Sequence, residues 1–450
     1  MAADSVAAAV GATEMEEKES SIGAALAAAT CSLLGVAAIA PAQAQEVPTW
    51  QVDTAALYYG ESDGRVKDAS VSVNARRDFQ DERFLSLDLS VDTLTGASPN
   101  GALAQGGAQT FTSPSGKASY STNRDKIPLD DTFKDTRVAG GINWTQPFAR
   151  LYTFSAGLGA SSEYDYQHAG VNLGLSRDFN QRNTTLSTGL SYSSDKIDPV
   201  GGAPMPLSQM LDVGNLANRA GSKSKDIVDA LFGVTQVISR TTVLRLNYSY
   251  SDSSGYLNDP YKILSVVDPV SGDAIPRTPA AGTTGPSSVY LFESRPDTRR
   301  KQALYGELKK YLSGKVLSLS YRYMTDDWGI DSNTVEARFR WPFQTGMYLE
   351  PTLRFYTQTA ADFYKLSLPL GQPLPRFASA DYRLSDFNAT TVGLKFGREL
   401  GNGQQWSARL EYYQQTGSAP SGLLIGNQAT RDQTPGLKAI IAQFTYRFGL

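Results

Sequence analysis

The last residues of the chain alternate between apolar and polar side chains. From Ile440 to Leu450 the even positions carry Ile, Ala, Phe, Tyr, Phe and Leu, while most odd positions carry polar or small residues. A β-strand points successive side chains to opposite faces, so this period of two predicts a strand with one apolar face and one polar face.

The same alternation recurs along the chain from Trp50 onward. The segment 85–91 shows it well, because Leu85, Leu87, Leu89 and Val91 alternate with Ser and Asp. Counting segments of this kind predicts about 16 strands. They span residues 50–58, 70–76, 85–91, 138–144, 152–158, 171–175, 186–192, 228–238, 244–250, 303–312, 317–323, 335–341, 349–355, 392–396, 406–412 and 440–450.

The predicted connections are of two kinds. Short ones such as 313–315 alternate with long ones, which span residues 93–131, 194–225, 251–300, 358–384 and 416–438. An even number of strands, short turns on one side and long loops on the other are typical of a transmembrane β-barrel of the Gram-negative outer membrane. We therefore predict an all-β fold: a single antiparallel up-and-down barrel in which strand 440–450 pairs with strand 50–58. Its apolar face would contact outer-membrane lipid. A large water-soluble barrel or sandwich is the alternative, but it does not explain the alternation of loop lengths.

The N-terminal residues resemble a secretion signal. An Ala- and Leu-rich apolar run over 21–40 is followed by a small-x-small sequence that ends at Ala44. This pattern predicts a signal peptide over residues 1–44 and a barrel over residues 45–450, with Met15 as an alternative start. Cys31, the only cysteine, lies in this leader, so the predicted mature chain has no disulfide.

Composition argues against several classes of function. The net charge of -3 gives no basic excess for nucleic-acid binding. His168 is the only histidine, which excludes His-rich metal sites and multi-histidine catalytic centres; a catalytic pair with the nearby Asp165 has no supporting pattern. The segment 326–333 has the composition of a calcium loop without the bidentate Glu, which favours an acidic tight turn. No metal, cofactor or enzymatic activity is predicted, and an outer-membrane hydrolase ranks only third among the hypotheses.

Charged residues on the polar face of the strands would line the lumen. Acidic positions predominate in the first half and arginines in the second. An acidic wall opposite an arginine wall would orient dipolar solutes and select ions. The alternative is that these charges pair locally or keep the lumen wet. The candidate lumen-lining charges are Asp53, Asp88, Asp92, Asp229, Arg245, Arg322, Arg338, Arg340, Arg354, Arg409 and Arg447.

Several stretches resemble a family of Gram-negative proteins known as domain of unknown function 3570. They are residues 27–35, 255–262, 295–299, 326–330, 360–364 and 379–385. The resemblance implies an outer-membrane barrel without an established activity. Most of these stretches fall in or beside predicted outer loops, where barrels carry function. The candidate functional residues there are Tyr256, Asp259, Tyr261, Asp326, Asp327, Trp328, Asp362, Tyr364, Asp381, Tyr382 and Arg383.

Two functions remain open. The first is a channel or solute-permeation barrel with a charged lumen, in which the loop 251–300 folds inward as a constriction or stands outside as a binding surface. The second is an interaction barrel that holds a periplasmic or surface partner; the gene neighbours typical of the family imply a redox or flavin-linked protein. The barrel assembly machinery is a further expected partner, although its tag usually ends in Phe or Trp and this chain ends in Leu450.

Overall fold

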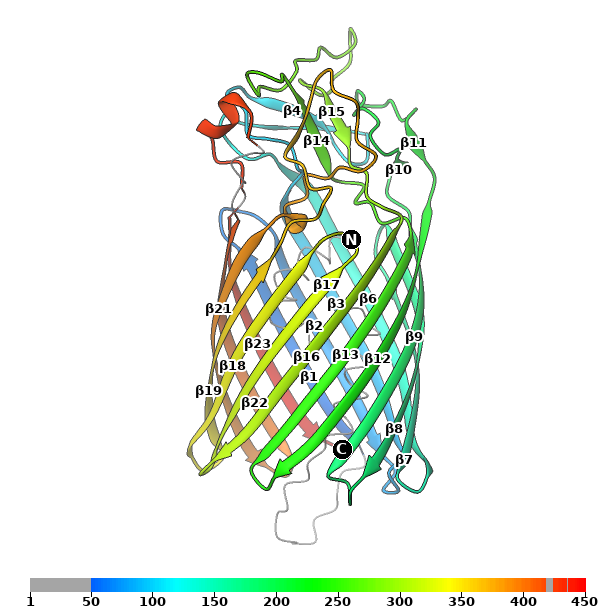
Figure 1. Cartoon of the computed structure of the whole chain (residues 1–450), viewed down its shortest axis with the longest axis vertical. Coiled ribbons are helices and arrows are strands. Elements are labelled where there is room, and N and C mark those ends of the chain that lie inside the picture. The colour runs from blue at the N-terminus through cyan, green and yellow to red at the C-terminus, as the bar shows by residue number, and fades with distance from the viewer. Residues whose placement is uncertain (1–49, 418–423, 435) are drawn as a thin grey trace.

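The chain forms one closed antiparallel barrel of 16 strands beneath a folded cap (Figure 1). The computed structural model describes residues 50–417, 424–434 and 436–450; the predicted leader lies outside them. In ring order the strands are β1 (Trp50–Glu61), β2 (Lys67–Asp78), β3 (Phe84–Pro99), β6 (Leu129–Ala149), β7 (Tyr152–Ser162), β8 (Tyr166–Phe179), β9 (Thr184–Ile197), β12 (Lys223–Ser239), β13 (Thr242–Gly255), β16 (Thr298–Leu312), β17 (Lys315–Asp326), β18 (Asp331–Gln344), β19 (Met347–Gln358), β21 (Phe387–Gly401), β22 (Gln404–Gly417) and β23 (Leu437–Gly449). Each of the 16 predicted strands corresponds to one of these.

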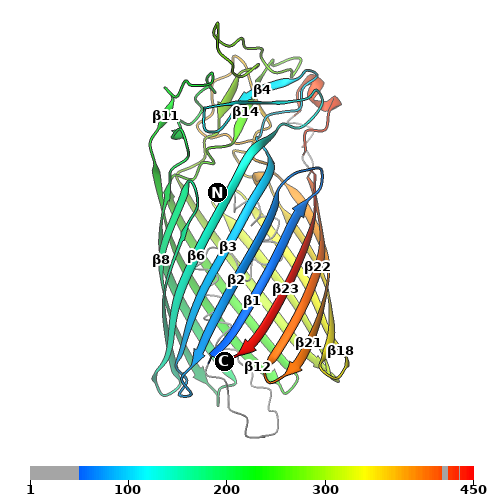
Figure 2. The same cartoon turned by 180° about the vertical axis from the view of Figure 1, so that it is seen from behind.

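The predicted closing seam is confirmed. Strand β23 pairs with β1 from Ala439 opposite Glu61 to Gly449 opposite Gln51. Trp50 and Leu450 exchange backbone hydrogen bonds of 2.8 and 3.1 Å. The described chain therefore starts and finishes at the same rim, and the sheet has no free edge (Figure 2).

The polarity of the wall is inverted relative to a water-soluble protein. On β22, Leu410 is 59% exposed, whereas the adjacent Glu411 is 2% exposed. Exposed Leu, Val, Ile and Phe side chains recur at every second position around the ring. An apolar outer face of this kind suits contact with lipid hydrocarbon. In residues 50–417, 424–434 and 436–450, no helix has the length and apolarity needed to cross a membrane.

The two rims of the barrel have different connections; we call the rim at which β1 begins and β23 ends the inner rim, and the opposite one the outer rim. The inner rim has only tight turns, such as Asn402–Gly403, where φ values of 52° and 73° match a type I′ hairpin. At the outer rim, residues 62–66, 163–165 and 327–330 also form short turns, so long and short outer connections are mixed. The strands also extend beyond the alternating segments, which shortens the predicted loop 251–300 to residues 256–297.

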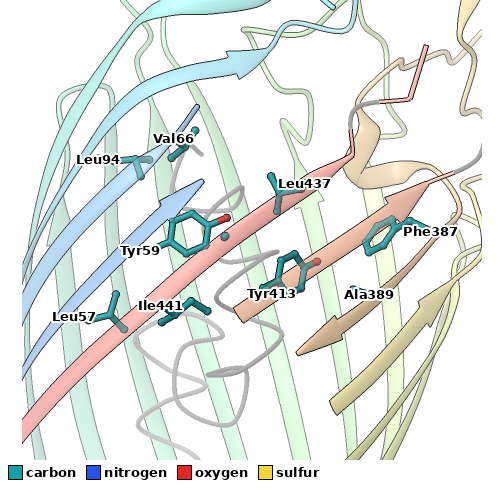
Figure 3. Packing of buried hydrophobic residues seen from close by; sticks show 10 residues of the cluster. Leu57, Tyr59, Val66, Leu94, Phe387, Ala389, Tyr413, Leu437 and Ile441 are labelled. Atoms are coloured by element: carbon teal, nitrogen blue, oxygen red, sulfur yellow. The ribbon is translucent and has the colours of Figure 1, made fainter. Parts of the chain in front are cut away.

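Near the outer rim, apolar side chains cover part of the inner wall. Leu57, Tyr59, Tyr413 and Ile441 are buried in one cluster shared by β1, β22 and β23. Figure 3 shows them close together on neighbouring strands. The two tyrosine hydroxyls donate hydrogen bonds to residues of their own strands: Tyr59 to Glu61 (2.9 Å) and Tyr413 to Gln415 (3.0 Å). The wall near the outer rim therefore carries a patch of buried apolar and aromatic side chains on β1, β22 and β23.

Candidate functional site: the capped outer mouth

The long outer loops fold together into a cap above the barrel (Figure 1). Strands β4 (Gln109–Thr112) and β5 (Ser119–Thr122) form one hairpin, and β10 (Ala203–Pro204) pairs with β11 (Arg219–Ala220). A third sheet joins two loops: β14 (Ile263–Val267) pairs with β15 (Tyr290–Phe292) and, in parallel, with β20 (Ser367–Pro369). The loops that follow β3, β9, β13 and β19 leave the ring at separated points, so the cap extends across the mouth.

The cap has a hydrophobic core of its own. Phe111 lies with its ring centroid 4.7 Å from Tyr290 and 5.2 Å from Tyr120. The cluster around them draws residues from three loops, including Met210 and Ile263. Because each loop alone is too short to bury such side chains, their packing together makes the cap one body.

A second cluster fastens the cap to the barrel rim. Trp328, in the short turn between β17 and β18, packs edge-on against Phe363 with centroids 5.1 Å apart. Its indole Nε1 donates to the backbone carbonyl of Thr298 at 2.8 Å. The carboxylate of Asp326 accepts backbone N–H bonds from Trp328 (3.0 Å) and Ile330 (2.9 Å) and pairs with Arg299 at 2.5 Å. The segment 326–333 is thus the acidic tight turn that the composition favoured.

A buried ion network joins the loop 256–297 to the loop 359–386. The guanidinium of Arg383 contacts Asp381 and Asp259, each at 2.5 Å. Arg295 contacts Glu293 at 2.6 Å and Asp381 at 2.7 Å. Opposite charges in this buried position stabilise each other only as a complete set, because removing one leaves another uncompensated.

Burial and neighbouring charge act in opposite directions on these groups. Burial alone would raise the pKa of the Asp381 carboxyl, but Arg383, Lys262 and Arg295 outweigh it and hold that pKa well below its usual range. Burial raises the pKa of the Glu293 carboxyl to about 7, because Arg295 only partly offsets the loss of water and Asp259 and Asp381 add repulsion. Glu293 is therefore the group of the network that titrates near neutral pH.

The same network reaches the barrel wall through Lys262 and Tyr382. Burial lowers the pKa of the Lys262 ammonium, which the nearby Asp381 and Asp259 oppose. Its Nζ donates to the carbonyl of Pro99 (2.5 Å) at the end of β3. Tyr382, in the short 3-10 helix η1 (Tyr382–Leu384), lies between the Lys262 ammonium and the Arg65 guanidinium, 5.8 and 5.7 Å from its ring centroid. The cap is thus tied to β3 and to the turn between β1 and β2.

The predicted loop residues fall into distinct roles in this region. Asp259, Asp381 and Arg383 form the ion network, while Trp328 and Tyr364 belong to the hydrophobic core. Asp327 accepts the backbone N–H of Arg300 at 2.9 Å, and the backbone N–H groups of Tyr261 and Asp362 donate to Asp259 (3.0 Å) and Trp328 (2.8 Å). Tyr256 lines a cavity. Sequence reasoning missed Glu293, Arg295 and Lys262, although 255–262 and 295–299 were among the stretches singled out.

That cavity lies at the side of the cap and has a volume of about 730 Å³. The segments around β10 and β11 form one wall, the start of β12 and residues 255–258 another, and residues 294–297 with Arg376 and Phe377 complete it. Its lining contains the cations Lys196, Lys223, Arg295 and Arg376 and the carboxylate Asp297. This volume lies within the range of small-molecule sites.

The predicted lumen charges lie on barrel strands, at positions that alternate with the exposed apolar side chains. Several pair with neighbours. Arg447 contacts Asp53 across the seam and Arg137 contacts Asp92, both at 2.5 Å. Other recorded pairs are Arg338 with Glu336 (2.8 Å) and Glu307 (3.5 Å), Arg340 with Glu399 (3.5 Å) and Arg409 with Glu411 (3.7 Å). These contacts correspond to the local pairing that the sequence left open as an alternative.

The remaining positions differ in their surroundings. Asp88 accepts from Asn74 at 2.6 Å and Asp229 from Ser191 at 3.1 Å. Arg245 faces Glu307 in the register of β13 and β16, Arg354 is buried, and Arg322 lies opposite Thr334 on β18. A transverse field across the lumen stays a prediction.

His168 has a different partner from the one considered in the sequence. Its Nδ1 lies 2.6 Å from Asp195 on the adjacent strand β9, and Asp195 also accepts from the Tyr166 hydroxyl and contacts Lys225 at 3.4 Å. The two residues are register partners, a relation that parity alone does not specify. Asp165 instead lies with Asp135 and Glu163, whose carboxylate oxygens come within 4.8 Å of one another.

Several solved structures have some similarity to this chain. A bacterial polysaccharide outer membrane secretin is similar with a TM-score of 0.43 and 9% identity, over 90% of this chain and 100% of that one. A mutant of the ferric enterobactin receptor PfeA from Pseudomonas aeruginosa gives 0.41 and 10%, over 84% and 55% of the two chains. The CymD monoaromatic hydrocarbon channel gives 0.39 and 8%, over 90% and 89%. Likeness of this degree carries no argument about function.

Sequence comparison gives the family. No curated protein matches the chain. A family model described as "Protein of unknown function (DUF3570)" matches residues 23–448, nearly the whole chain and every described loop of the cap. The chain belongs to this DUF3570 family.

Proposed function

We propose that this chain is a selective solute-permeation barrel of the Gram-negative outer membrane, with the cap controlling entry at the outer mouth. The observation that carries the proposal is the buried ion network, which ties loops from separate parts of the ring together above the lumen. A closed sheet of 16 strands encloses an aqueous channel unless something fills it. A cap joined by ion pairs and a small core is a removable cover for such a channel.

The chemistry of the wall supports passage of a polar solute. Inward positions of the strands carry charges that keep water in the lumen, while the outer face is apolar. The buried aromatic residues near the outer rim, Tyr59 and Tyr413, add a surface against which a solute would be discriminated by shape. Permeation rather than reaction is the role that this arrangement supports.

Planar-bilayer recording of the purified mature protein tests the proposal. We expect small or brief conductance from the wild type and larger, longer openings from Arg383→Ala, which removes one member of the network. Arg182→Ala, at an exposed inner-rim turn, is the matched control and should conduct like the wild type. Migration of unheated and boiled samples on gels checks that each barrel is folded. Silence of folded wild type and Arg383→Ala alike would overturn the channel.

The interaction barrel is the second candidate. It is favoured by the folded cap itself, because a rigid body with its own core offers a fixed surface to a partner. A silent barrel that co-purifies with a redox lipoprotein or flavoprotein would support this candidate. A conducting barrel without such a partner would exclude it.

A further inference from the structure

The cavity at the side of the cap shares Arg295 with the ion network and is otherwise lined by residues outside that network. Its lining residues come from the β10–β11 segment, from the ends of β9 and β12 that carry the cap, and from residues 255–258, 294–297, 376 and 377. We infer that this cavity binds an organic anion with a compact apolar body. This anion would be the solute that the barrel admits, bound here before it enters the lumen. The role of this anion as the transported solute rests on the proposed function. The binding site itself is inferred from the residues that line the cavity.

Charge is the first argument for an anion. Four cationic side chains and one carboxylate line the cavity. Two of the cations are already compensated: Arg295 by Glu293 and Asp381, and Lys196 by Asp198 at 3.2 Å. Lys223 and Arg376 are exposed, and neither forms a recorded ion pair within the described part of the chain. A net positive concave site of this kind attracts anions and holds them by charge-assisted hydrogen bonds.

The apolar lining is the second argument, because it excludes a bare inorganic ion as the best occupant. Met205, Leu257 and Phe377 line the cavity together with two prolines. The Arg376 guanidinium lies 4.9 Å from the centroid of the Phe377 ring, so a cation and an apolar surface are presented side by side. A ligand with a carboxylate at one side and a ring or short hydrocarbon at the other would satisfy both.

Tyr256 supplies a polar contact of the right kind. Burial, reinforced by Glu293 and Asp259, raises the pKa of its phenol far above neutral, so the hydroxyl keeps its proton. A protonated phenol donates a hydrogen bond to a carboxylate oxygen. The cavity lining next to Tyr256, formed by Asn258 and Arg295, is held together by a hydrogen bond. The backbone N–H of Arg295 donates to the Asn258 side chain at 2.5 Å.

This lining also connects the cavity to the cap. Arg295 lines the cavity and at the same time contacts Glu293 and Asp381 in the buried network. An anion in the cavity would compete with these carboxylates for the same guanidinium. Its arrival would therefore weaken the ties between the two loops, which connects recognition of the solute to release of the cap.

Binding of 1-naphthoate tests the site, with the equally sized neutral 1-naphthamide as its counterpart. Titration calorimetry uses the full mature protein in lipid nanodiscs, and empty nanodiscs correct for partition into lipid. We expect the acid to bind about tenfold or more tightly than the amide, which corresponds to about 1.4 kcal/mol of charge recognition. The double variant Lys223→Gln, Arg376→Gln should lose this preference.

The matched control removes two cap cations that do not line the cavity, Lys117→Gln with Arg124→Gln. It should bind both probes as the wild type does. If the double variant folds poorly, Lys223→Glu alone replaces it, since that side chain is exposed at the start of β12. The proposed site would be overturned if the wild type bound the acid and the amide equally well, or bound neither. It would also be overturned if the control variant lost the preference for the acid as much as the double variant does.

Two further measurements identify the source of the bound anion and distinguish binding from permeation. Nanodiscs with lipopolysaccharide test whether a lipid phosphate occupies the cavity: loss of naphthoate binding there would overturn assignment to a diffusing solute. Bilayer recording with naphthoate separates the two proposals. If the barrel binds naphthoate selectively but never conducts, the binding site is supported and the permeation function is rejected. If the barrel conducts but shows no selective binding, permeation is supported and the binding site is rejected.

Discussion

Arg383 and Asp259 are 124 positions apart in the chain and form a 2.5 Å contact between a guanidinium nitrogen and a carboxylate oxygen. Their side chains are 12% and 8% exposed, so the pair is nearly removed from water. One residue belongs to the loop after β19 and the other to the loop after β13. Together with the Arg295–Asp381 contact and the pairing of β14 with β20, this contact joins the two loops above the barrel.

Replacing Arg383 should release the cap without unfolding the barrel. Arg383→Ala leaves Asp381 and Asp259 buried without their main cation, which typically destabilises by about 3–5 kcal/mol. Amide hydrogen exchange should show faster exchange in residues 256–297 and 359–386, with the barrel strands unchanged. Arg182→Ala, whose side chain is 60% exposed, should show neither effect. Unchanged exchange in both loops would show that the hydrophobic core and the β14–β20 pairing hold the cap without Arg383.

Stability of the cap should decrease as the pH rises toward neutrality. The pKa of Glu293 rises from 4.5 in the unfolded chain to about 7 in the folded cap. Between these values the folded cap binds a proton that the unfolded chain has lost, so the free energy of unfolding falls with rising pH and stays low above about 7. The pKa of Asp381 is lowered from 3.8, so its contribution is constant in this window and is lost only at lower pH.

Urea unfolding of the cap at about pH 5 and pH 8 measures this dependence. Trp328 fluorescence reports on the cap once the four other tryptophans are replaced by Phe. We expect a higher urea midpoint at the lower pH, and Glu293→Gln should make the two midpoints converge. A midpoint that rises with pH would contradict the assignment to Glu293.

Trp328 should be the largest single contributor to the hydrophobic attachment of the cap. It is 4% exposed and contacts Phe363, while the Arg299 guanidinium lies 4.4 Å from its ring centroid. Trp328→Ala should destabilise the cap by about 3–5 kcal/mol, the usual range for a buried aromatic residue. Amide exchange in residues 359–386 gives the measurement. Trp341→Ala, at a side chain that is 46% exposed on the barrel wall, should leave that segment protected.

The ion pair at the barrel seam should contribute little to stability. Arg447 and Asp53 lie 2.5 Å apart but are 41% and 36% exposed, and such pairs typically contribute about 0–1 kcal/mol. A double-mutant cycle with Arg447→Ala and Asp53→Ala, read from the temperature at which the barrel unfolds on gels, should give a coupling in that range. Larger coupling would mean that the seam depends on this pair beyond its backbone ladder.

The sequence alone was sufficient for the barrel. Alternation is a local property: a residue such as Leu410 lies on the exposed outer face while its neighbours Arg409 and Glu411 face the lumen, and each strand repeats this rule independently. The number of strands, the parity of the lumen charges and the pairing of the terminal strand with the first all follow from it. Strand bounds do not, because strands such as β6 continue beyond the alternating segment, and there the sequence has no period of two to mark them.

Only the tertiary structure decided the cap. Its residues have no period, and Asp259, Glu293 and Asp381 become one network through contacts between segments that are distant in the chain. The same limit applies to His168, whose partner Asp195 depends on the register of two strands. Strand geometry specifies which way a barrel side chain points, residue by residue. In the cap, ion pairs and packing act between different loops. The position of a cap side chain therefore depends on which loops lie next to each other above the mouth of the barrel.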